Sequence, residues 1–268
     1  MFNRTTLDVV RLLLCAWVLA AAPAGALAQA IADDAPAVTP YRPTVSTPAA
    51  LSVPGWVEIE AGGITTGQGL ERRESLPYSL KLAFSPDWGI RVDGEAAVAV
   101  TSDNGRVSYG LGDTAFVLKR RFSINDKSAF GMELQIAMPT AKELFHNGSG
   151  RTDYTVNSIY SADLSEVYHL DLNYAVTRLG TADETQGREQ SRWVAAVSRS
   201  LPRSWGLAGE LSGTSQAGAA QTRQILLAAS YTSSRRICWD FGAVRGLNAA
   251  SPQWSIFAGV TVLTLKLF

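Results

Sequence analysis

From residue 55 onward, apolar and polar side chains alternate with a period of two, and this pattern restricts the fold more than any other feature of the chain. Successive side chains of a β-strand point to opposite faces, so such a stretch has one apolar and one polar face. The alternation is cleanest over residues 78–84, 89–100, 130–138 and 168–176. It predicts that Leu134 and Leu172 lie on one face of a sheet, and that Glu133 and Asp171 lie on the other.

Weaker alternation fills the rest of this region and brings the total to twelve predicted strands. The weaker segments are residues 56–62, 109–122, 154–162, 192–201, 205–212, 224–231, 237–244 and 254–268. No stretch after the first 28 residues has a convincing helical period.

The connections between these segments alternate in length along the chain. The short ones are residues 85–88, 123–127, 163–166, 202–204 and 232–236. The longer ones, which are polar or rich in glycine, are residues 63–75, 101–108, 139–153, 178–191, 213–223 and 245–253. Short turns at one rim and longer loops at the other are typical of outer-membrane barrels, whereas a soluble β-sandwich has no reason to sort its loops by length. We therefore predict an all-β fold for residues 55–268, a transmembrane antiparallel up-and-down β-barrel of about 12 strands.

The first 28 residues have the pattern of a secretory signal peptide. Arg4 and Arg11 precede an apolar run at residues 12–22, and a small-x-small cleavage site ends at Ala28. The apolar run is too short for a membrane-spanning helix. Residues 29–54 contain five prolines, at 36, 40, 43, 48 and 54, so this stretch is predicted to be a flexible Pro-rich periplasmic lead-in. Signal peptide and barrel together predict export to the outer membrane of a Gram-negative bacterium.

The composition argues against several other classes of protein. The 24 basic and 24 acidic residues cancel, which gives no electrostatic reason to expect a nucleic-acid partner. His146 and His169 are the only histidines, Cys238 would be the one cysteine left after export, and no Gly-x-Ser-x-Gly motif occurs. We therefore expect no catalytic function, no cofactor and no metal site, and we expect the lipid of the outer membrane as the main partner.

Charged residues on the polar faces are predicted to line the lumen, because an arginine or lysine that faces lipid at mid-membrane costs about 2–4 kcal/mol. These candidate lumen residues are Arg91, Asp93, Glu95, Lys119, Arg121, Glu133, His169, Asp171, Glu210 and Asp240. His169 and Asp171 share a face at i and i+2 and are expected to form a hydrogen-bonded pair. The mixture of signs fits two structures, a salt-bridged filling of the interior or a charged constriction in a conducting pore, and the sequence does not choose between them.

Tyrosine and tryptophan gather near the ends of the predicted strands, as at Trp88, Tyr168, Trp205 and Trp254. Aromatic girdles at the two membrane interfaces have this distribution. Ordinary aromatic usage in β-rich chains is the alternative explanation.

Several short motifs in the middle of the chain follow one another in a familiar order. A Gly-x-Gly-Asp run at residues 110–113 begins a strand that ends in Lys-Arg-Arg-Phe at 119–122, and Pro139, a glycine-rich loop at 147–150 and Thr-Asp-Tyr at 152–154 follow. This order resembles the MetA-pathway of phenol degradation family, whose members are outer-membrane barrels of Gram-negative bacteria. The resemblance covers roughly residues 51–268. It implies an association with the uptake of aromatic or hydrophobic compounds.

Two classes of function fit these predictions. The first is a porin-like transport channel for small, aromatic or hydrophobic molecules, and the second is a non-transporting structural or adhesive barrel. The moderate loop lengths favour the channel. An apolar solute could leave sideways through the wall where a proline interrupts the strand ladder, and Pro139 is the position expected to do so.

Overall fold

The computed structural model describes residues 36–141, 150–180 and 185–268. The predicted signal peptide, residues 1–28, and the first part of the predicted lead-in lie outside these residues. Residues 37–268 form one compact unit, which is the barrel described below. In the described part of the chain, no helix is long and apolar enough to cross a membrane.

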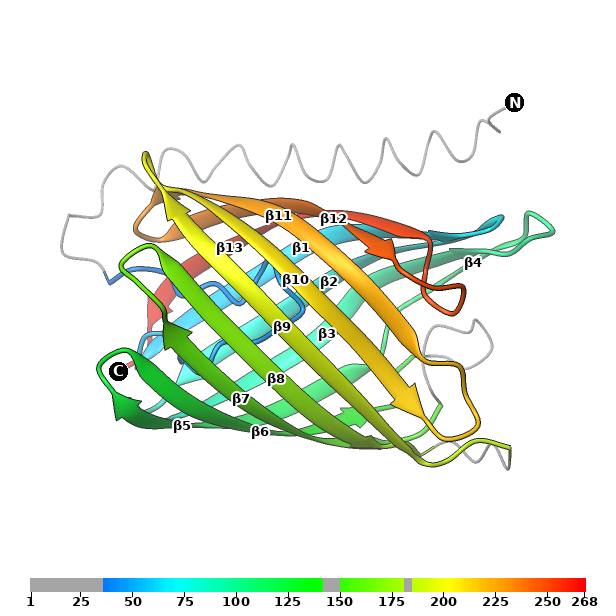
Figure 1. Cartoon of the computed structure of the whole chain (residues 1–268), viewed down its shortest axis with the longest axis horizontal. Helices are drawn as coiled ribbons and strands as arrows, with labels where there is room; N and C mark the ends of the chain where they lie inside the picture. The colour runs from blue at the N-terminus through cyan, green and yellow to red at the C-terminus, as the bar shows by residue number, and fades with distance from the viewer. Residues whose placement is uncertain (1–35, 142–149, 181–184) are drawn as a thin grey trace. The chain divides into compact units, whose positions relative to one another are not determined.

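The described residues form thirteen strands, and every pairing within the sheet is antiparallel. Their bounds are β1 Trp56–Gln68, β2 Glu71–Ala83, β3 Trp88–Thr101, β4 Val107–Gly110, β5 Thr114–Asn125, β6 Ser128–Met138, β7 Asp153–Asp163, β8 Tyr168–Arg178, β9 Glu189–Leu201, β10 Trp205–Gln216, β11 Thr222–Ser234, β12 Ile237–Gly246 and β13 Trp254–Lys266. Figure 1 shows the long strands tilted across the barrel.

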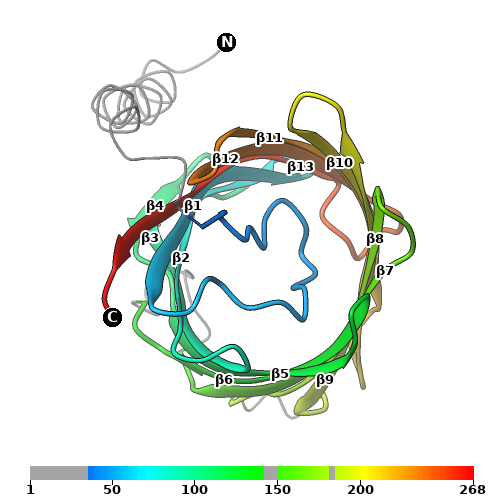
Figure 2. The same ribbon diagram turned by 90° about the vertical axis from the view of Figure 1, so that its left-hand side faces the viewer.

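The strands close into a ring of twelve positions, which confirms the predicted barrel. Except for β4 and β5, strands that follow one another in the sequence pair with each other, and β1 pairs with β13 to close the circle. The short strand β4 and the strand β5 share one position, because both pair with the same edge of β3. Figure 2 shows the closed ring from its end. Trp56 of β1 pairs with Lys266 of β13, so the first and last strands begin and end at the same rim.

The two rims differ, although less strictly than predicted. Turns at residues 84–87, 126–127, 164–167, 202–204 and 235–236 define what we call the short-turn rim. The opposite, long-loop rim carries the connections at 102–106, 139–152, 179–188, 217–221 and 247–253. One expectation is wrong here, since residues 63–75 are not a long loop. They continue β1 and β2 as a hairpin with a two-residue turn, where Gly69 adopts a positive φ of 61°. A hairpin that extends past the lipid can be polar on both faces, so its alternation is lost in the sequence.

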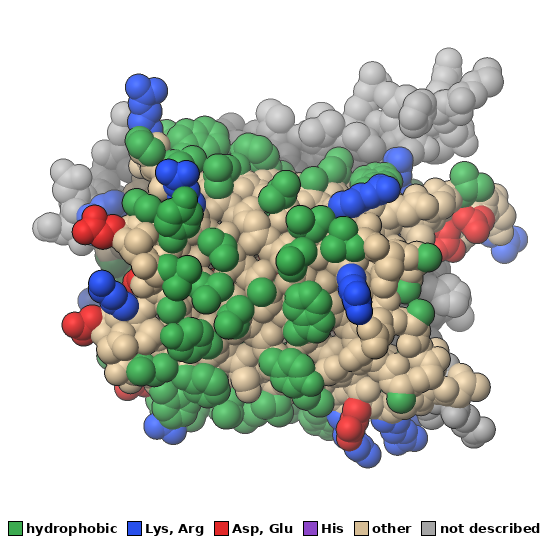
Figure 3. Space-filling model, viewed as in Figure 1, with side chains coloured by type: hydrophobic (Ala, Val, Ile, Leu, Met, Phe, Trp, Pro, Cys, Tyr) green, Lys and Arg blue, Asp and Glu red, His purple; other side chains and the backbone are tan. Residues whose placement is uncertain are grey.

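The wall has the predicted apolar outer face. Leu134 and Leu172 are 49% and 40% exposed on the outside, whereas Glu133 is 4% exposed and faces the lumen. Figure 3 shows hydrophobic side chains spread over one outer face of the barrel. The alternation therefore gave the correct register, because a slip of one residue would have reversed every side chain.

A break in the strand ladder lies beside β3, not at residue 139. Pro139 was expected to interrupt a strand, but β6 ends at Met138 and the proline belongs to the loop. The register of β2 against β3 shifts between Ser75 and Pro77, where the proline has no N–H to donate. On the other side of β3, residues 111–113 separate β4 from β5.

This register shift reverses the facing of the last part of β3. Ile90 is 46% exposed on the outer face, as the alternation predicts. Val98 was expected on the same face, but it is 2% exposed and lies inside the barrel, opposite the buried Ser75. The irregularity adds one residue to one strand of the pair. Beyond it, positions that the alternation assigns to the outer face point into the barrel, and the reverse.

Candidate functional site: a polar lumen occupied by the chain's own N-terminal segment

Residues 37–54, which we call the plug, lie inside the barrel (Figure 2). The Val38 N–H donates to the carbonyl of Arg235 in a turn of the short-turn rim, at 2.7 Å, and β1 begins at Trp56 on that same rim. The segment thus enters and leaves the lumen at one end. This corrects the prediction that residues 29–54 form a flexible periplasmic lead-in, at least from residue 37 onward.

The backbone of the plug bonds to side chains of the wall because its prolines prevent it from joining the ladder. A backbone N–H that is buried must find an acceptor, and here the acceptors are carboxylates, an amide and a hydroxyl. The bonds are Thr39 N to Glu58, 2.7 Å; Tyr41 N to Glu60, 2.6 Å; Val45 N and Ser46 N to Glu210, 2.7 and 3.0 Å; Thr47 N to Asn173, 2.7 Å; and Ala49 N to Ser161, 2.7 Å. These acceptors come from β1, β10, β8 and β7, so the plug is held from several sides of the ring.

Two lysines and an asparagine of the wall bond to carbonyl groups of the plug. Lys81 donates to the Thr39 carbonyl at 2.8 Å, and Lys119 donates to the Pro48 carbonyl. The Asn173 amide donates to the Thr47 carbonyl at 2.9 Å. The wall therefore supplies both acceptors and donors to a segment that has no regular structure of its own.

Tyr41 is the aromatic centre of the plug and is 8% exposed. The Nζ atoms of Lys81 and Lys119 lie 3.9 and 4.2 Å from its ring centroid, and the guanidinium carbon of Arg91 lies 5.6 Å away. Its hydroxyl donates to the Ala50 carbonyl at 2.8 Å, and burial raises the pKa of this phenol well above its ordinary value. Three cations that face one ring are attracted by its negative face, which anchors the tyrosine.

Arg42 makes the one bidentate ion pair between the plug and the wall among the described residues. Its Nε and Nη2 atoms donate to the two carboxylate oxygens of Asp240 on β12, at 2.9 and 2.8 Å. The guanidinium lies against Gly62 and Gly259, where an added Cβ would stand 3.0 Å or less from it. Glycine at these two strand positions leaves the space that the arginine occupies.

Four of the ten predicted lumen residues, Arg91, Asp93, Lys119 and Glu133, form one network beside the plug. Glu133 accepts from Arg91 at 3.0 Å and lies 3.4 Å from Lys119, and Arg91 also pairs with Asp93 at 2.8 Å. Nearer the long-loop rim, Glu95 of β3 forms a bidentate ion pair with Arg73 of β2.

The remaining candidates divide between the plug and the short-turn rim. Glu210 and Asp240 bind the plug directly. Arg121 is half-buried near the start of the turn that follows β5. Tyr41 and Arg42 were missed, because a tyrosine and an arginine in a Pro-rich stretch carry no periodic signal.

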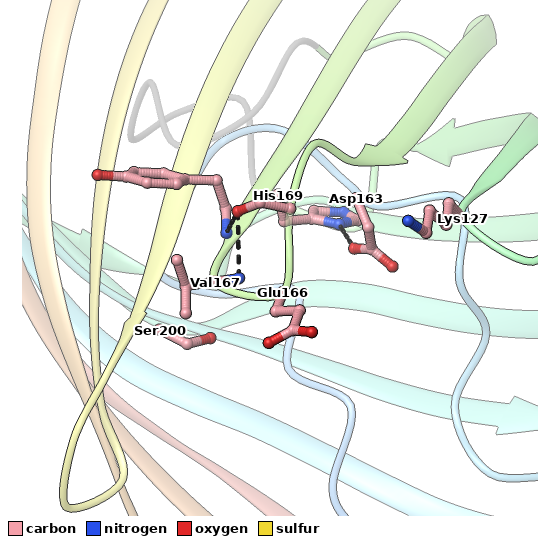
Figure 4. Close-up of a pocket in the computed structure, with 8 residues that line it drawn as sticks. Lys127, Asp163, Glu166, Val167, His169 and Ser200 are labelled. Atoms are coloured by element: carbon pink, nitrogen blue, oxygen red, sulfur yellow. Dashed lines mark hydrogen bonds and ion pairs between the residues drawn. The ribbon is translucent and has the colours of Figure 1, made fainter.

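His169 and Asp171 form the predicted pair, at 3.3 Å, near the short-turn rim. Asp171 also accepts from the Ser161 hydroxyl, which in turn accepts from the Ala49 N–H of the plug. His169 is also 2.6 Å from Asp163, from the end of β7. Figure 4 shows His169 and Asp163 with Lys127 and Glu166 around a shallow pocket of about 240 Å³ at the rim. The pair joins β7 to β8, and its contact with the plug is indirect, through Ser161.

Comparisons with known proteins agree on the fold. No family profile and no curated protein sequence matches the chain. Among solved structures, it resembles an outer membrane channel from Pseudomonas putida F1, with a TM-score of 0.64, 12% identity, and coverage of 85% of this chain and 100% of that one. The NanC porin matches with a TM-score of 0.56, 10% identity, and coverage of 78% and 100%. The KdgM porin matches with a TM-score of 0.55, 10% identity, and coverage of 78% and 99%. The chain therefore has the fold of outer-membrane channels and porins.

Proposed function

We propose that the chain is an outer-membrane channel for small molecules, and that the plug closes its lumen from the short-turn side. The observation that carries this proposal is the way the plug is held. Its contacts are mainly hydrogen bonds and ion pairs to polar side chains of the wall, which water can solvate equally well once the plug leaves. Barrels of about eight strands are filled by side chains alone, whereas this ring of twelve positions holds a separate segment of the chain.

The outer surface and the rims support this location and orientation. The apolar wall suits lipid, and the fold is shared with outer-membrane channels. In outer-membrane barrels the short turns and both termini face the periplasm, and the longer loops face outward. The plug then enters from the periplasm.

The energy of the plug contacts favours reversible closure. A neutral hydrogen bond contributes only about 0.5–1.5 kcal/mol net, and one to a charged group about 1.5–3 kcal/mol, because water replaces the lost partner. Displacing the plug would leave a hydrated passage lined by charges of both signs. Small solutes are the class that this passage fits, and aromatic or hydrophobic compounds are the class that the family resemblance implies.

Conductance in planar bilayers tests the proposal. The purified mature protein is compared with a variant that carries Glu210→Gln and Asp240→Asn, which weakens two plug contacts and leaves the ladder intact. We expect low conductance from the first and clearly higher conductance from the second. If neither conducts, and an unboiled gel shift shows that both are folded, the structural or adhesive alternative replaces the channel.

A further inference from the structure

Three arginines lie on the outer face of the wall near the long-loop rim, where most outward side chains are apolar. They are Arg72 on β2, Arg223 on β11 and Arg245 on β12. Arg223 and Arg245 are exposed and Arg72 is half-buried. The alternation fixes their direction, since Leu227 on β11 and Phe241 on β12 share their faces and are 65% and 52% exposed. In Figure 3, blue side chains stand among hydrophobic ones on the right-hand half of the wall.

The register brings these arginines together across neighbouring strands. Arg245 pairs with Trp254 of β13, Trp254 pairs with Gly67 of β1, and Gly67 pairs with Arg72. Three strand spacings of about 4.8 Å separate the backbones of Arg72 and Arg245 by about 14 Å. Arg245 pairs with Ile225 of β11, and Arg223 lies two residues nearer the long-loop rim on that strand. The backbones of Arg223 and Arg245 are therefore about 8 Å apart.

Aromatic side chains at the same level mark this row as a membrane interface. Trp254 lies within the row, and the guanidinium carbon of Arg72 is 5.9 Å from its ring centroid. Arg223 pairs with Gly213, and Gly213 pairs with the outward Trp193 of β9. Tryptophan prefers the headgroup level, and an arginine there reaches polar groups while its stem stays in the apolar layer.

None of the three guanidinium groups has an ion-pair partner within the described part of the chain. The nearest acid on the outer face of β2 is Glu74, which lies two residues further from the rim and forms no such pair with Arg72 among the described residues. The three positive charges are therefore free to bind an anion from outside the protein.

We propose that Arg72, Arg223 and Arg245 form a binding site for the phosphorylated headgroup of lipopolysaccharide in the outer leaflet. The guanidinium group binds phosphate with two parallel hydrogen bonds, and several arginines on one patch suit a headgroup that carries more than one phosphate. This assignment rests on the proposed orientation, in which the long-loop rim faces outward. It goes beyond transport, because it concerns the lipid around the barrel and not a solute within it.

The opposite rim provides a matched control. Arg120 on β5 lies over the rings of Trp88 and Phe122, at 4.9 and 4.5 Å, and Arg199 on β9 lies 5.3 Å from the ring of Tyr168. These two arginines point outward like the first three, but they stand on well-separated strands, and no second arginine shares the rings that each of them lies over. Removing them changes the net charge by the same amount as removing two arginines of the patch.

The test measures lipid bound to the purified folded protein by native mass spectrometry. Rough lipopolysaccharide, the same lipid with its phosphates removed, and phosphatidylglycerol are the three probes. The variant Arg223→Ala/Arg245→Ala should bind intact lipopolysaccharide at least tenfold more weakly than wild type, whereas Arg120→Ala/Arg199→Ala should bind it as wild type does. An unboiled gel shift confirms that each variant is folded.

Three outcomes would overturn the site. They are equal binding by wild type and the patch variant, equal loss in the control variant, or binding of phosphatidylglycerol or dephosphorylated lipid as strong as that of intact lipopolysaccharide. Conductance is measured on the same samples. A barrel that binds lipopolysaccharide through the patch and never conducts would contradict the channel and leave the lipid site standing.

Discussion

The ion pair between Arg42 and Asp240 offers the sharpest perturbation of the plug. We predict that Arg42→Ala greatly increases the fraction of molecules in which the plug has left the lumen. Arg42 is 19% exposed and Asp240 is 3% exposed at the side chain, so the variant leaves a nearly buried carboxylate without its partner as long as the plug stays in place. Departure of the plug lets water reach Asp240, and the substitution therefore penalises the closed state more than the open one.

The size of the effect follows from the burial of the pair. Removing one partner of a fully buried ion pair costs about 3–5 kcal/mol. Because the Arg42 side chain is 19% exposed, we take about 2–3 kcal/mol for this pair. Every 1.4 kcal/mol is a factor of ten in an equilibrium constant, so the open population should rise by about 30-fold to 150-fold.

Thiol labelling measures this population directly. Ser46 is 1% exposed within the plug, so Ser46→Cys in a Cys238→Ser background should react with a membrane-impermeant reagent only when the plug opens. Arg42→Ala should accelerate labelling, and adding Asp240→Asn should reverse much of the increase because no buried charge is then left unpaired. Arg106→Ala, in a loop of the opposite rim, is the control for the change of charge. An increase of less than threefold for Arg42→Ala would refute the reasoning.

Three further predictions concern the same network and the wall. Gly259→Ala places a Cβ 2.4 Å from Nε of Arg42 and should accelerate the same labelling, whereas Gly209→Ala, whose nearest neighbour would be 3.6 Å away, should not. Glu133→Gln removes the negative charge that Arg91 and Lys119 share, and it should lower the temperature at which the gel shift is lost. A cysteine at Leu134 should resist the impermeant reagent in every background, because it faces lipid. A cysteine at Glu133 should react only in variants that open the plug, and equal reaction at the two positions would contradict the wall register.

The barrel could be predicted from the sequence because its signal is local. The facing of Leu134 and Glu133 depends only on their own strand, and one buried face fixes the register of the whole ladder. The errors fall where that local rule fails. Val98 changes face after a register shift. The polar hairpin at residues 63–75 has no apolar face that would produce an alternating pattern in the sequence. Pro139 was misplaced because a proline marks a break equally well inside a strand or just after its end.

The plug could not be predicted, because its contacts join residues that are far apart in the chain. The Thr47 N–H reaches Asn173, and Arg42 reaches Asp240, 198 positions away. A Pro-rich segment reads as a linker whenever its partners are unknown, since prolines exclude helix and ladder but not a docked irregular path. The candidate lumen charges were located by their faces alone, without any indication of what they bind.

The charged groups of the lumen suit both the state with the plug in place and the proposed open state. The sequence fits two structures of the lumen, a salt-bridged filling or a charged constriction. The contacts with the plug correspond to the first, and the proposed open state would correspond to the second. With the plug in place, Glu60 and Glu210 accept from its backbone and Lys119 donates to it, so the carboxylates and ammonium groups act as a filling. With the plug displaced, the same groups would line a hydrated passage. An apolar lumen could not serve both states, because exposing it to water would cost about 25 cal/mol for each Å². Polar side chains lose little when water replaces a peptide group, and this near balance would allow the plug of the proposed channel to leave the lumen.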